Sequence, residues 1–330
     1  AKWGADWVDT RVQEGKLQVR LKPLSEYRPL FDETGRFLIV QSEEVTDRYL
    51  TAPIHINVTH PQQTLKPQGG DSVLEVMQNN IDAILAQREA TGQPMMPHLN
   101  HPNFGWAVTA EEFMQLKGEQ FFEVYNGHPS VRNEGDETHA SLERFWDIVL
   151  TWRLGVLDLP VMYGIATDDA HNYHDEAIGK SNPGRGWVVV RSRYLTPEHL
   201  IRAMEVGDFY ASSGVVINEI SHDVKGIELS IEQTSDEHYT TYFIGTRKDF
   251  DPAHEPYRAG NGDPVRVTHR YSDSIGTVLA EVDGISPSYT YQGDEIYVRA
   301  KVVSSKSMIN PYKEGEVECA WIQPIVLKQH

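Results

Sequence analysis

The amino-acid sequence predicts an α/β domain over residues 1–214, followed by a smaller all-β sandwich over residues 215–330. Up to about Ser213, short apolar runs alternate with segments of helical periodicity, which is the pattern of parallel strands joined by helices. After about Gly214 the helical periodicity almost disappears, and alternating strand patterns follow one another. The alternation of strands and helices is compatible with a closed barrel and with an open sheet.

The α/β domain contains apolar runs that have the composition of buried parallel strands. They are Phe37–Val40, Ile54–Val58, Met95–His98, Phe121–Tyr125, Val161–Ala166 and Trp187–Val190. Between them, apolar residues recur with helical spacing. The predicted helices are Ser72–Ala90, Thr109–Leu116, His139–Leu154 and Thr196–Val206.

Local signals mark the ends of several of these helices. Asp71 or Ser72 can cap the first helix, and Gly92 can end it. Thr109 opens a Thr-Ala-Glu-Glu sequence, which is a capping-box pattern. Pro197 stands at the first position of the last helix, where a missing backbone N–H is tolerated.

The region after residue 214 consists of period-two strand patterns separated by turn residues. The predicted strands are Gly226–Gln233, Tyr239–Gly245, Val265–Tyr271, Thr277–Val282, Glu295–Val303 and Glu318–Val326. Their aromatic residues are spaced as sandwich core and cross-strand pairs would be. We find no catalytic pattern here, and we expect a structural or interaction domain.

Composition excludes several classes of partner. The formal net charge of the 330 residues is −18, so nucleic acid, which requires clustered Lys and Arg, is not an expected partner. No stretch is apolar and long enough to span a bilayer. Cys319 is the single cysteine, so no internal disulfide can form, and cysteine usage leaves the cellular compartment open.

Polar groups gather where the predicted strands end. The five strand ends carry Glu43 and Glu44; His55 and His60; His98 and His101; Glu123 and His128; and Asp168, Asp169 and His171. Because the carboxyl ends of successive parallel strands meet on one face of an α/β sheet or barrel, these groups are expected to converge there. Imidazole and carboxylate donors suit zinc, iron or manganese, so the pattern predicts a metal centre.

The sequence Asp169-Ala170-His171 closely follows a mostly apolar run, Val161–Ala166. Side chains two apart on an extended strand point the same way, which would place an oxygen and a nitrogen donor side by side. The alternative is a helix start, in which Asp168 or Asp169 is the N-cap and His171 lies in the first turn.

The order Glu44, His55, His101-Pro102 and Asp169-x-His171 resembles the polymerase-and-histidinol-phosphatase (PHP) superfamily of metal-dependent phosphoesterases. The similarity continues through Pro183–Val190 and Ala203–Val215, and so covers about the first two thirds of the chain. It implies a distorted (β/α)7 barrel that holds up to three zinc, manganese or iron ions. The trailing β-region resembles the sandwich appended to some bacterial PHP proteins.

The resemblance also assigns candidate roles. Its acidic bridging ligand would be Glu44, with Glu43 the less favoured neighbour by register. The remaining implied ligands are His55, His101, Asp169 and His171. His98 is the alternative to His101, or an outer ligand. Asp168 would orient a ligand histidine. His128 would be a further ligand, contact the substrate or protonate the leaving oxygen, and Arg185 would hold a phosphate oxygen unless it is only a turn residue before a strand.

One part of the PHP pattern is absent before Glu44. PHP domains begin with a His-x-His strand and continue with a strand ending in Asp-His, and neither motif occurs in residues 1–43. We expect an upstream segment of roughly 60 residues, the length of two β/α units. The alternative is a protein that has lost this half of the site and holds one or two ions.

The predicted function is a metal-dependent hydrolase, most simply a phosphoesterase that acts through metal-activated water on a small-molecule or saccharide-type substrate. Hydrolysis of a carbohydrate derivative or sulfate ester is the alternative, with Phe104, Trp106, Tyr125 or Tyr173 stacking on a sugar ring or filling the core. A non-catalytic binding protein with a degenerate site is the third possibility. Export is weakly favoured over the cytoplasm, and the oligomeric state is left open.

Overall fold

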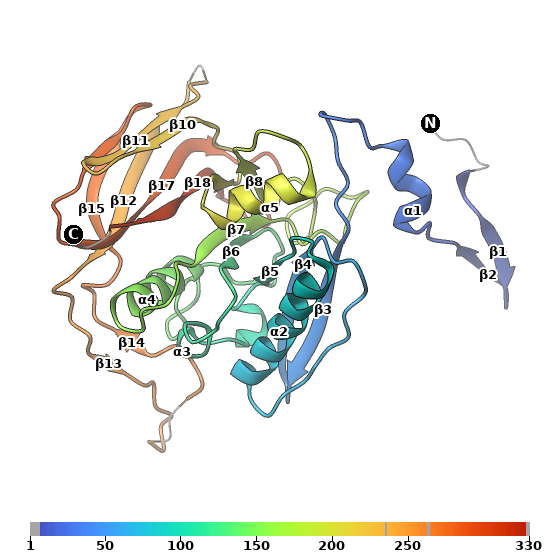
Figure 1. Cartoon of the computed structure of the whole chain (residues 1–330), viewed down its shortest axis with the longest axis horizontal. Helices are drawn as coiled ribbons and strands as arrows, with labels where there is room; N and C mark the ends of the chain where they lie inside the picture. The colour runs from blue at the N-terminus through green and yellow to red at the C-terminus, as the bar shows by residue number, and fades with distance from the viewer. Residues whose placement is uncertain (1–6, 235, 263–264, 328–330) are drawn as a thin grey trace.

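The computed structural model describes residues 7–234, 236–262 and 265–327. Within these residues the protein has a mixed α/β fold with a five-stranded sheet, a six-stranded sheet and three smaller ones. Figure 1 shows the two large sheets side by side, with helices packed against the five-stranded one.

The five-stranded sheet carries the N-terminal half of the fold. Its strands, in spatial order, are β3 (Ser42–Tyr49), β4 (Ala52–Thr59), β5 (Met96–Leu99), β6 (Phe121–Asn126) and β7 (Tyr163–Thr167). β5, β6 and β7 are parallel as predicted, whereas β3, β4 and β5 are antiparallel neighbours. Among the described residues the sheet is open, with β3 and β7 at its edges. The predicted seven-stranded barrel is therefore not shown.

The antiparallel start of this sheet comes from a tight hairpin. Tyr49 pairs with Ala52, so only two residues join β3 to β4, and Leu50 takes a φ of 53° to close the turn. The predicted strand over Phe37–Val40 is wrong, because this segment contributes only an isolated bridge between Glu33 and Phe37. The strand begins five residues after Phe37, at Ser42.

Four α-helices cover or flank the sheet at the predicted places. They are α2 (Val73–Thr91), α3 (Ala110–Phe113), α4 (Leu142–Gly155) and α5 (Pro197–Glu205). Ser72 accepts the Glu75 N–H at the start of α2, and Gly92 ends that helix with a φ of 65°. Thr109 forms the predicted capping box with Glu112. A short 3-10 helix, η3 (Phe104–Trp106), precedes α3.

The six-stranded sheet is antiparallel throughout. Its order is β15 (Thr277–Asp283), β12 (Tyr239–Arg247), β17 (Glu295–Ser307), β18 (Val317–Val326), β9 (Phe209–Ser212) and β8 (Trp187–Val190). β8 and β9 precede residue 214 in the chain, yet β9 pairs with β18. Backbone hydrogen bonding thus continues across the predicted boundary, and the division into domains 1–214 and 215–330 stays a prediction.

A three-stranded sheet packs with the six-stranded one. It contains β10 (Ile217–His222), β11 (Gly226–Ile231) and β16 (Ser288–Thr290). One buried apolar cluster includes Ile227 and Leu229 from this sheet and Phe243 and Val298 from the larger one. The two sheets therefore share a core, while the predicted sandwich topology stays a prediction. A two-residue pair, β13 (His254–Glu255) with β14 (Arg270–Tyr271), lies near α3.

The described N-terminal residues form an arm that is not part of either large sheet. The arm contains a hairpin of β1 (Thr10–Gln13) and β2 (Lys16–Val19), α1 (Leu24–Tyr27) and the 3-10 helix η2 (Arg28–Leu30). Figure 1 shows it extending away from the two large sheets, and none of these four elements contains a buried residue. Along the described parts of the chain, no helix is both long and apolar enough to cross a bilayer.

A buried ion pair ties α4 to β17. Arg299 donates from Nε and Nη2 to the two oxygens of Asp147 over 2.8 and 2.7 Å, and the Tyr297 hydroxyl also donates to Asp147 over 2.8 Å. Arg299 is 1% exposed and Asp147 is 4% exposed. Removing one partner of such a pair leaves a buried charge without compensation.

We therefore expect Asp147→Ala to lower the free energy of unfolding by about 3 kcal/mol in urea titrations. The matched control is Asp294→Ala, which breaks the exposed pair between Asp294 and Arg247 and should change stability by less than about 1 kcal/mol. Equal effects of the two substitutions would contradict a structural role for the buried pair.

Candidate metal centre

Glu44, His55 and His101 form the tightest group of metal-ligating side chains among the described residues. One ligand atom from each lies within 4.8 Å of the other two. The Glu44 Oε1 atom is 3.3 Å from His55 Nδ1, and the rings of His55 and His101 are 5.1 Å apart between centroids. The structure thus brings together three of the predicted ligands.

Strand register explains why these side chains meet. Glu44 lies opposite Asn57 and Thr46 lies opposite His55 in the antiparallel pair of β3 and β4. Directly opposed residues point to the same face, so Glu44 and His55 share that face. The adjacent Glu43 points the other way, where its carboxylate accepts the Leu65 N–H over 3.0 Å. The register therefore favours Glu44 over Glu43.

The carboxylate of Glu44 is held in its charged form. Its contact with His55, together with the charge of His101 and an Asn100 amide that donates over 2.9 Å, lowers the pKa of Glu44, although partial burial acts in the opposite direction. An ionised carboxylate beside two imidazoles is a donor set that suits a divalent transition metal.

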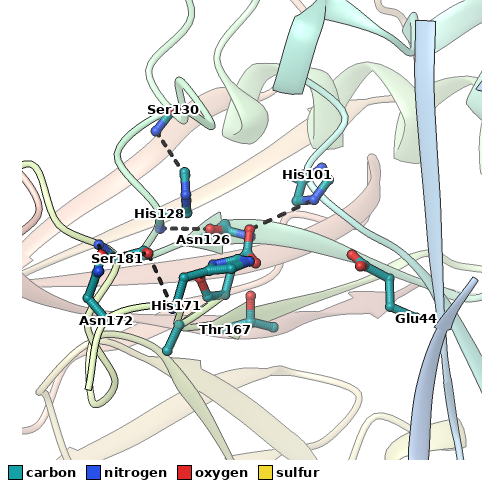
Figure 2. Close-up of polar contacts among 12 residues, drawn as sticks. Glu44, His101, Asn126, His128, Ser130, Thr167, His171, Asn172 and Ser181 are labelled. Atoms are coloured by element: carbon teal, nitrogen blue, oxygen red, sulfur yellow. Dashed lines mark hydrogen bonds and ion pairs between the residues drawn. The ribbon is translucent and has the colours of Figure 1, made fainter. Parts of the chain in front are cut away.

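Asp169 lies beside this cluster and His171 lies at its rim. The Asp169 Oδ2 atom is 3.8 Å from His101 Nε2 and accepts from the Asn126 amide over 3.4 Å. Figure 2 shows His101 and Glu44 on one side of Asn126, and His128 on the other. The side chain of His171 is 66% exposed, and its Nδ1 lies 2.8 Å from the backbone oxygen of Asp169.

We expected Asp169 and His171 to share one face of an extended strand, and they do not. β7 ends at Thr167, and Asp169 takes a φ of 48°, in the left-handed region. No described helix begins at this point, so the helix-cap alternative is also wrong. Asp168 does not orient a ligand histidine, because its carboxylate accepts the backbone N–H groups of Gly184, Arg185 and Gly186 over 2.7–2.9 Å.

Several of the candidate site residues line a pocket of about 230 Å³. Its lining residues are Glu44, Asn57, Asn100, Glu123, Thr167, Asp169, Ala170 and His171. No Lys or Arg occurs among these described lining residues. The carboxylates of Glu44, Glu123 and Asp169 in this lining favour a cation.

Glu123 is one of the strand-end groups expected to converge here, but the sequence did not assign it a role. It is 1% exposed in the middle of β6, and its carboxylate accepts the His101 backbone N–H, the Asn126 amide and the Thr167 hydroxyl over 2.8–3.0 Å. The sequence does indicate a buried carboxylate, because Glu123 stands inside the apolar run Phe121-Phe122-Glu123-Val124-Tyr125. A carboxylate buried in such a strand requires hydrogen-bond partners.

Burial would raise the pKa of the Glu123 carboxyl, but His98, His101 and Asn126 outweigh burial and lower it to about 2. Its contribution to stability is therefore present above the ordinary pKa of 4.5 and is lost as pH falls toward 2. For the metal-free protein, we expect a loss of up to about 3 kcal/mol over this interval in urea titrations at stepped pH. Glu123→Gln should flatten this part of the curve, and an unchanged slope would contradict the assignment.

His128 lies next to His171, at the edge of the candidate site. Its backbone N–H donates to Asn126 Oδ1 over 2.8 Å, and its Nδ1 accepts the Ser130 N–H over 3.1 Å, so the neutral ring carries its proton on Nε2. Its ring lies 5.4 Å from that of His171. Burial, with the charges of His171 and other nearby groups, lowers the pKa of His128, although Asp169 acts in the opposite direction.

Arg185 does not face the pocket, which corrects the predicted contact with a substrate phosphate. It is fully buried, and its donors are taken by protein oxygens. The acceptors are Gly127 O, Ala177 O, Lys180 O, Asn182 Oδ1, Asn310 O, Asn310 Oδ1 and Pro311 O. Gly127 permits this approach, because a Cβ there would lie 2.7 Å from the Cβ of Arg185. Arg185 therefore anchors the loop that carries Asp169 and His171.

The predicted stacking aromatics are mostly engaged elsewhere. Phe104 packs against the rings of His55 and His101. Trp106 is stacked on His139 and contacted by Arg132. Tyr125 is buried against Trp321. Tyr173 is the most exposed of the four candidates, at 67%.

Comparison with known proteins yields a distant similarity. No known protein family and no curated protein matches the chain. Among solved structures, it is similar to a two-domain protein containing a predicted PHP-like metal-dependent phosphoesterase from Bacteroides vulgatus, with 13% sequence identity and a TM-score of 0.31 over 86% of this chain and 74% of that one. Similarity at this level does not establish a shared fold, so the chemistry rests on the side chains described above.

Proposed function

We propose that the protein is a metal-dependent hydrolase, most simply a phosphoesterase, whose metal ligands are Glu44, His55 and His101. The supporting observation is that ligand atoms of these three residues lie within 4.8 Å of one another beside a pocket. Asp169 adds a second carboxylate near His101, and His98 and His171 complete the set of nearby imidazoles. Zinc, manganese or iron suits such donors.

A bound transition metal would supply a water that ionises near neutral pH and would stabilise charge on an ester oxygen. The chain's own residues would complete the site. The Glu44 and Asp169 carboxylates would neutralise the cation. Glu123 and Asn126 would fix the position of the loops that carry His101 and His128. The Nε2 proton of His128 would be available to the departing oxygen.

The test begins with the purified chain loaded with Zn²⁺, Mn²⁺ or Fe²⁺ and its metal content measured. Panels of phosphate esters, sulfate esters and glycosides then follow, with release of product recorded. The expected result is at least one bound ion and turnover of phosphate esters. If only sulfate esters or glycosides are hydrolysed, the proposed substrate class, phosphate esters, is wrong. Bound metal without any turnover would favour a binding protein.

A further inference from the structure

A second pocket, of about 440 Å³, lies between the five-stranded sheet and α5. Most of its lining side chains are apolar. The lining residues are Val40, Thr59, Met96, His98, Ile165, Ala166, Thr167, Val188, Val190, Pro197, Leu200, Ile201 and Met204. None of these described lining residues is Asp, Glu, Lys or Arg. The volume falls within the range of small-molecule sites, and the lining suits an uncharged, largely apolar ligand.

His98 is the exception in this lining. It is 6% exposed, and neither of its ring nitrogens has a hydrogen-bond partner. Its nearest ionic neighbour, Glu123 Oε1, is 3.7 Å from Nε2, which is beyond hydrogen-bond distance. Apart from this ion-pair contact with Glu123, the buried imidazole makes no hydrogen bond, so a ligand that offers it one would gain affinity.

The apolar pocket adjoins the candidate metal centre. Thr167 lines both pockets, and His98 in one lies beside Glu123 in the other. The metal-side pocket is small and lined by carboxylates, amides and an imidazole, whereas the second is larger and mostly apolar. A substrate that occupied both would have a charged reacting end and an apolar remainder.

We propose that the second pocket binds the alcohol part of an ester substrate, and that this alcohol is apolar and carries one further hydroxyl that pairs with His98. The proposal rests on the hydrolase function above and adds the substrate class: a phosphate ester of an aromatic or branched aliphatic alcohol. Hydrolysis forms a P–O bond from water, breaks the P–O bond to the alcohol and delivers a proton to the alcohol oxygen. The freed alcohol is the species that the pocket retains.

Alcohol binding can be measured on the metal-free protein, independently of catalysis. The probes are naphthalene-2,6-diol, which has the second hydroxyl, and 2-naphthol, which lacks it, both followed by fluorescence titration. We expect 1:1 binding with the diol favoured. His98→Leu should weaken diol binding by about fivefold to tenfold, the effect of one lost hydrogen bond, and leave 2-naphthol within about twofold.

A second pair of variants tests the location. Leu200→Trp places an indole in the pocket and should weaken both probes by at least about tenfold, because the apolar contact area is lost. Arg202→Trp adds the same side chain at an exposed position of the same helix and should leave both affinities unchanged. Thermal unfolding of each variant verifies that it is folded.

The outcomes separate this proposal from the proposed function. If neither probe binds, or if Leu200→Trp binds both as well as the unchanged protein does, the pocket proposal is overturned whatever the activity. If the diol binds as expected and the metal-loaded protein hydrolyses 2-naphthyl phosphate faster than glycerol phosphate, the proposal is supported. If the metal-loaded protein hydrolyses both esters at equal rates, the substrate class is overturned and the hydrolase function stands.

Discussion

Glu44→Gln is expected to weaken Zn²⁺ binding by at least about 100-fold and to abolish measurable hydrolysis. The substitution preserves the shape of the side chain but removes the negative charge that compensates the cation, and it places an amide NH₂ next to His55 Nδ1, 3.3 Å from the present oxygen. Loss of an outer partner of a metal ligand typically costs 10–100-fold in affinity, so loss of a charged direct ligand should cost more. Isothermal titration with Zn²⁺ measures the affinity, and the ester panel measures the activity.

The matched control for this substitution is Glu43→Gln. Glu43 is the preceding residue on β3, faces the opposite side of the sheet and accepts the Leu65 N–H. The Glu43→Gln variant should bind Zn²⁺ within about threefold of the affinity of the unchanged protein, since the substitution alters only one hydrogen bond away from the site. If the two variants bind Zn²⁺ alike, Glu44 is not a ligand and the proposed metal centre is wrong.

Arg185→Met should lower the free energy of unfolding by about 4–5 kcal/mol. Methionine fills a similar volume, so the effect comes from the oxygens of residues 127, 177, 180, 182, 310 and 311, which lose a donor. The bonds to Gly127 O and Asn182 Oδ1 are buried, and the other five are partly buried. Urea titration of the metal-free protein measures the change. The variant should also bind metal less tightly, because the loop that carries Asp169 is no longer anchored.

Arg191→Met is the corresponding control. Arg191 is 69% exposed at its side chain and pairs with Asp208 over 2.8 Å at the surface. Its loss should cost less than about 1 kcal/mol. A small effect of Arg185→Met would show that its bonds to backbone oxygens are replaced by water, and that the loop does not depend on them.

Helices were predictable from the sequence because their signals are local. The Ser72 cap, the Thr109 capping box and the αL conformation at Gly92 depend on residues within one turn of each other. Strand direction was not predictable in the same way. The β3–β4 hairpin closes through Leu50 at positive φ, a position where a glycine or asparagine would have signalled a turn and a leucine does not.

Only part of the candidate site was predictable from the sequence. Glu44, His55 and His101 stand out as polar residues in or next to apolar strands. The β3–β4 register places Glu44 and His55 on one face, and His101 joins them from the loop that follows β5. The role of Arg185 could not be read from its neighbours, since its acceptors include Asn310 and Pro311, more than 120 residues away. Burial of Glu123 and the unpartnered nitrogens of His98 likewise depend on tertiary packing.

The bonds from Arg185 to Asn310 and Pro311 also bear on how this protein can change over evolution. They link the connection between β17 and β18 to the loop that carries Asp169, while β18 itself pairs with β9. Through these contacts the C-terminal third supports the loop that carries Asp169. Insertions or exchanges in the β17–β18 connection would alter the site without touching a ligand, so the two parts are expected to vary together and to resist recombination with foreign partners.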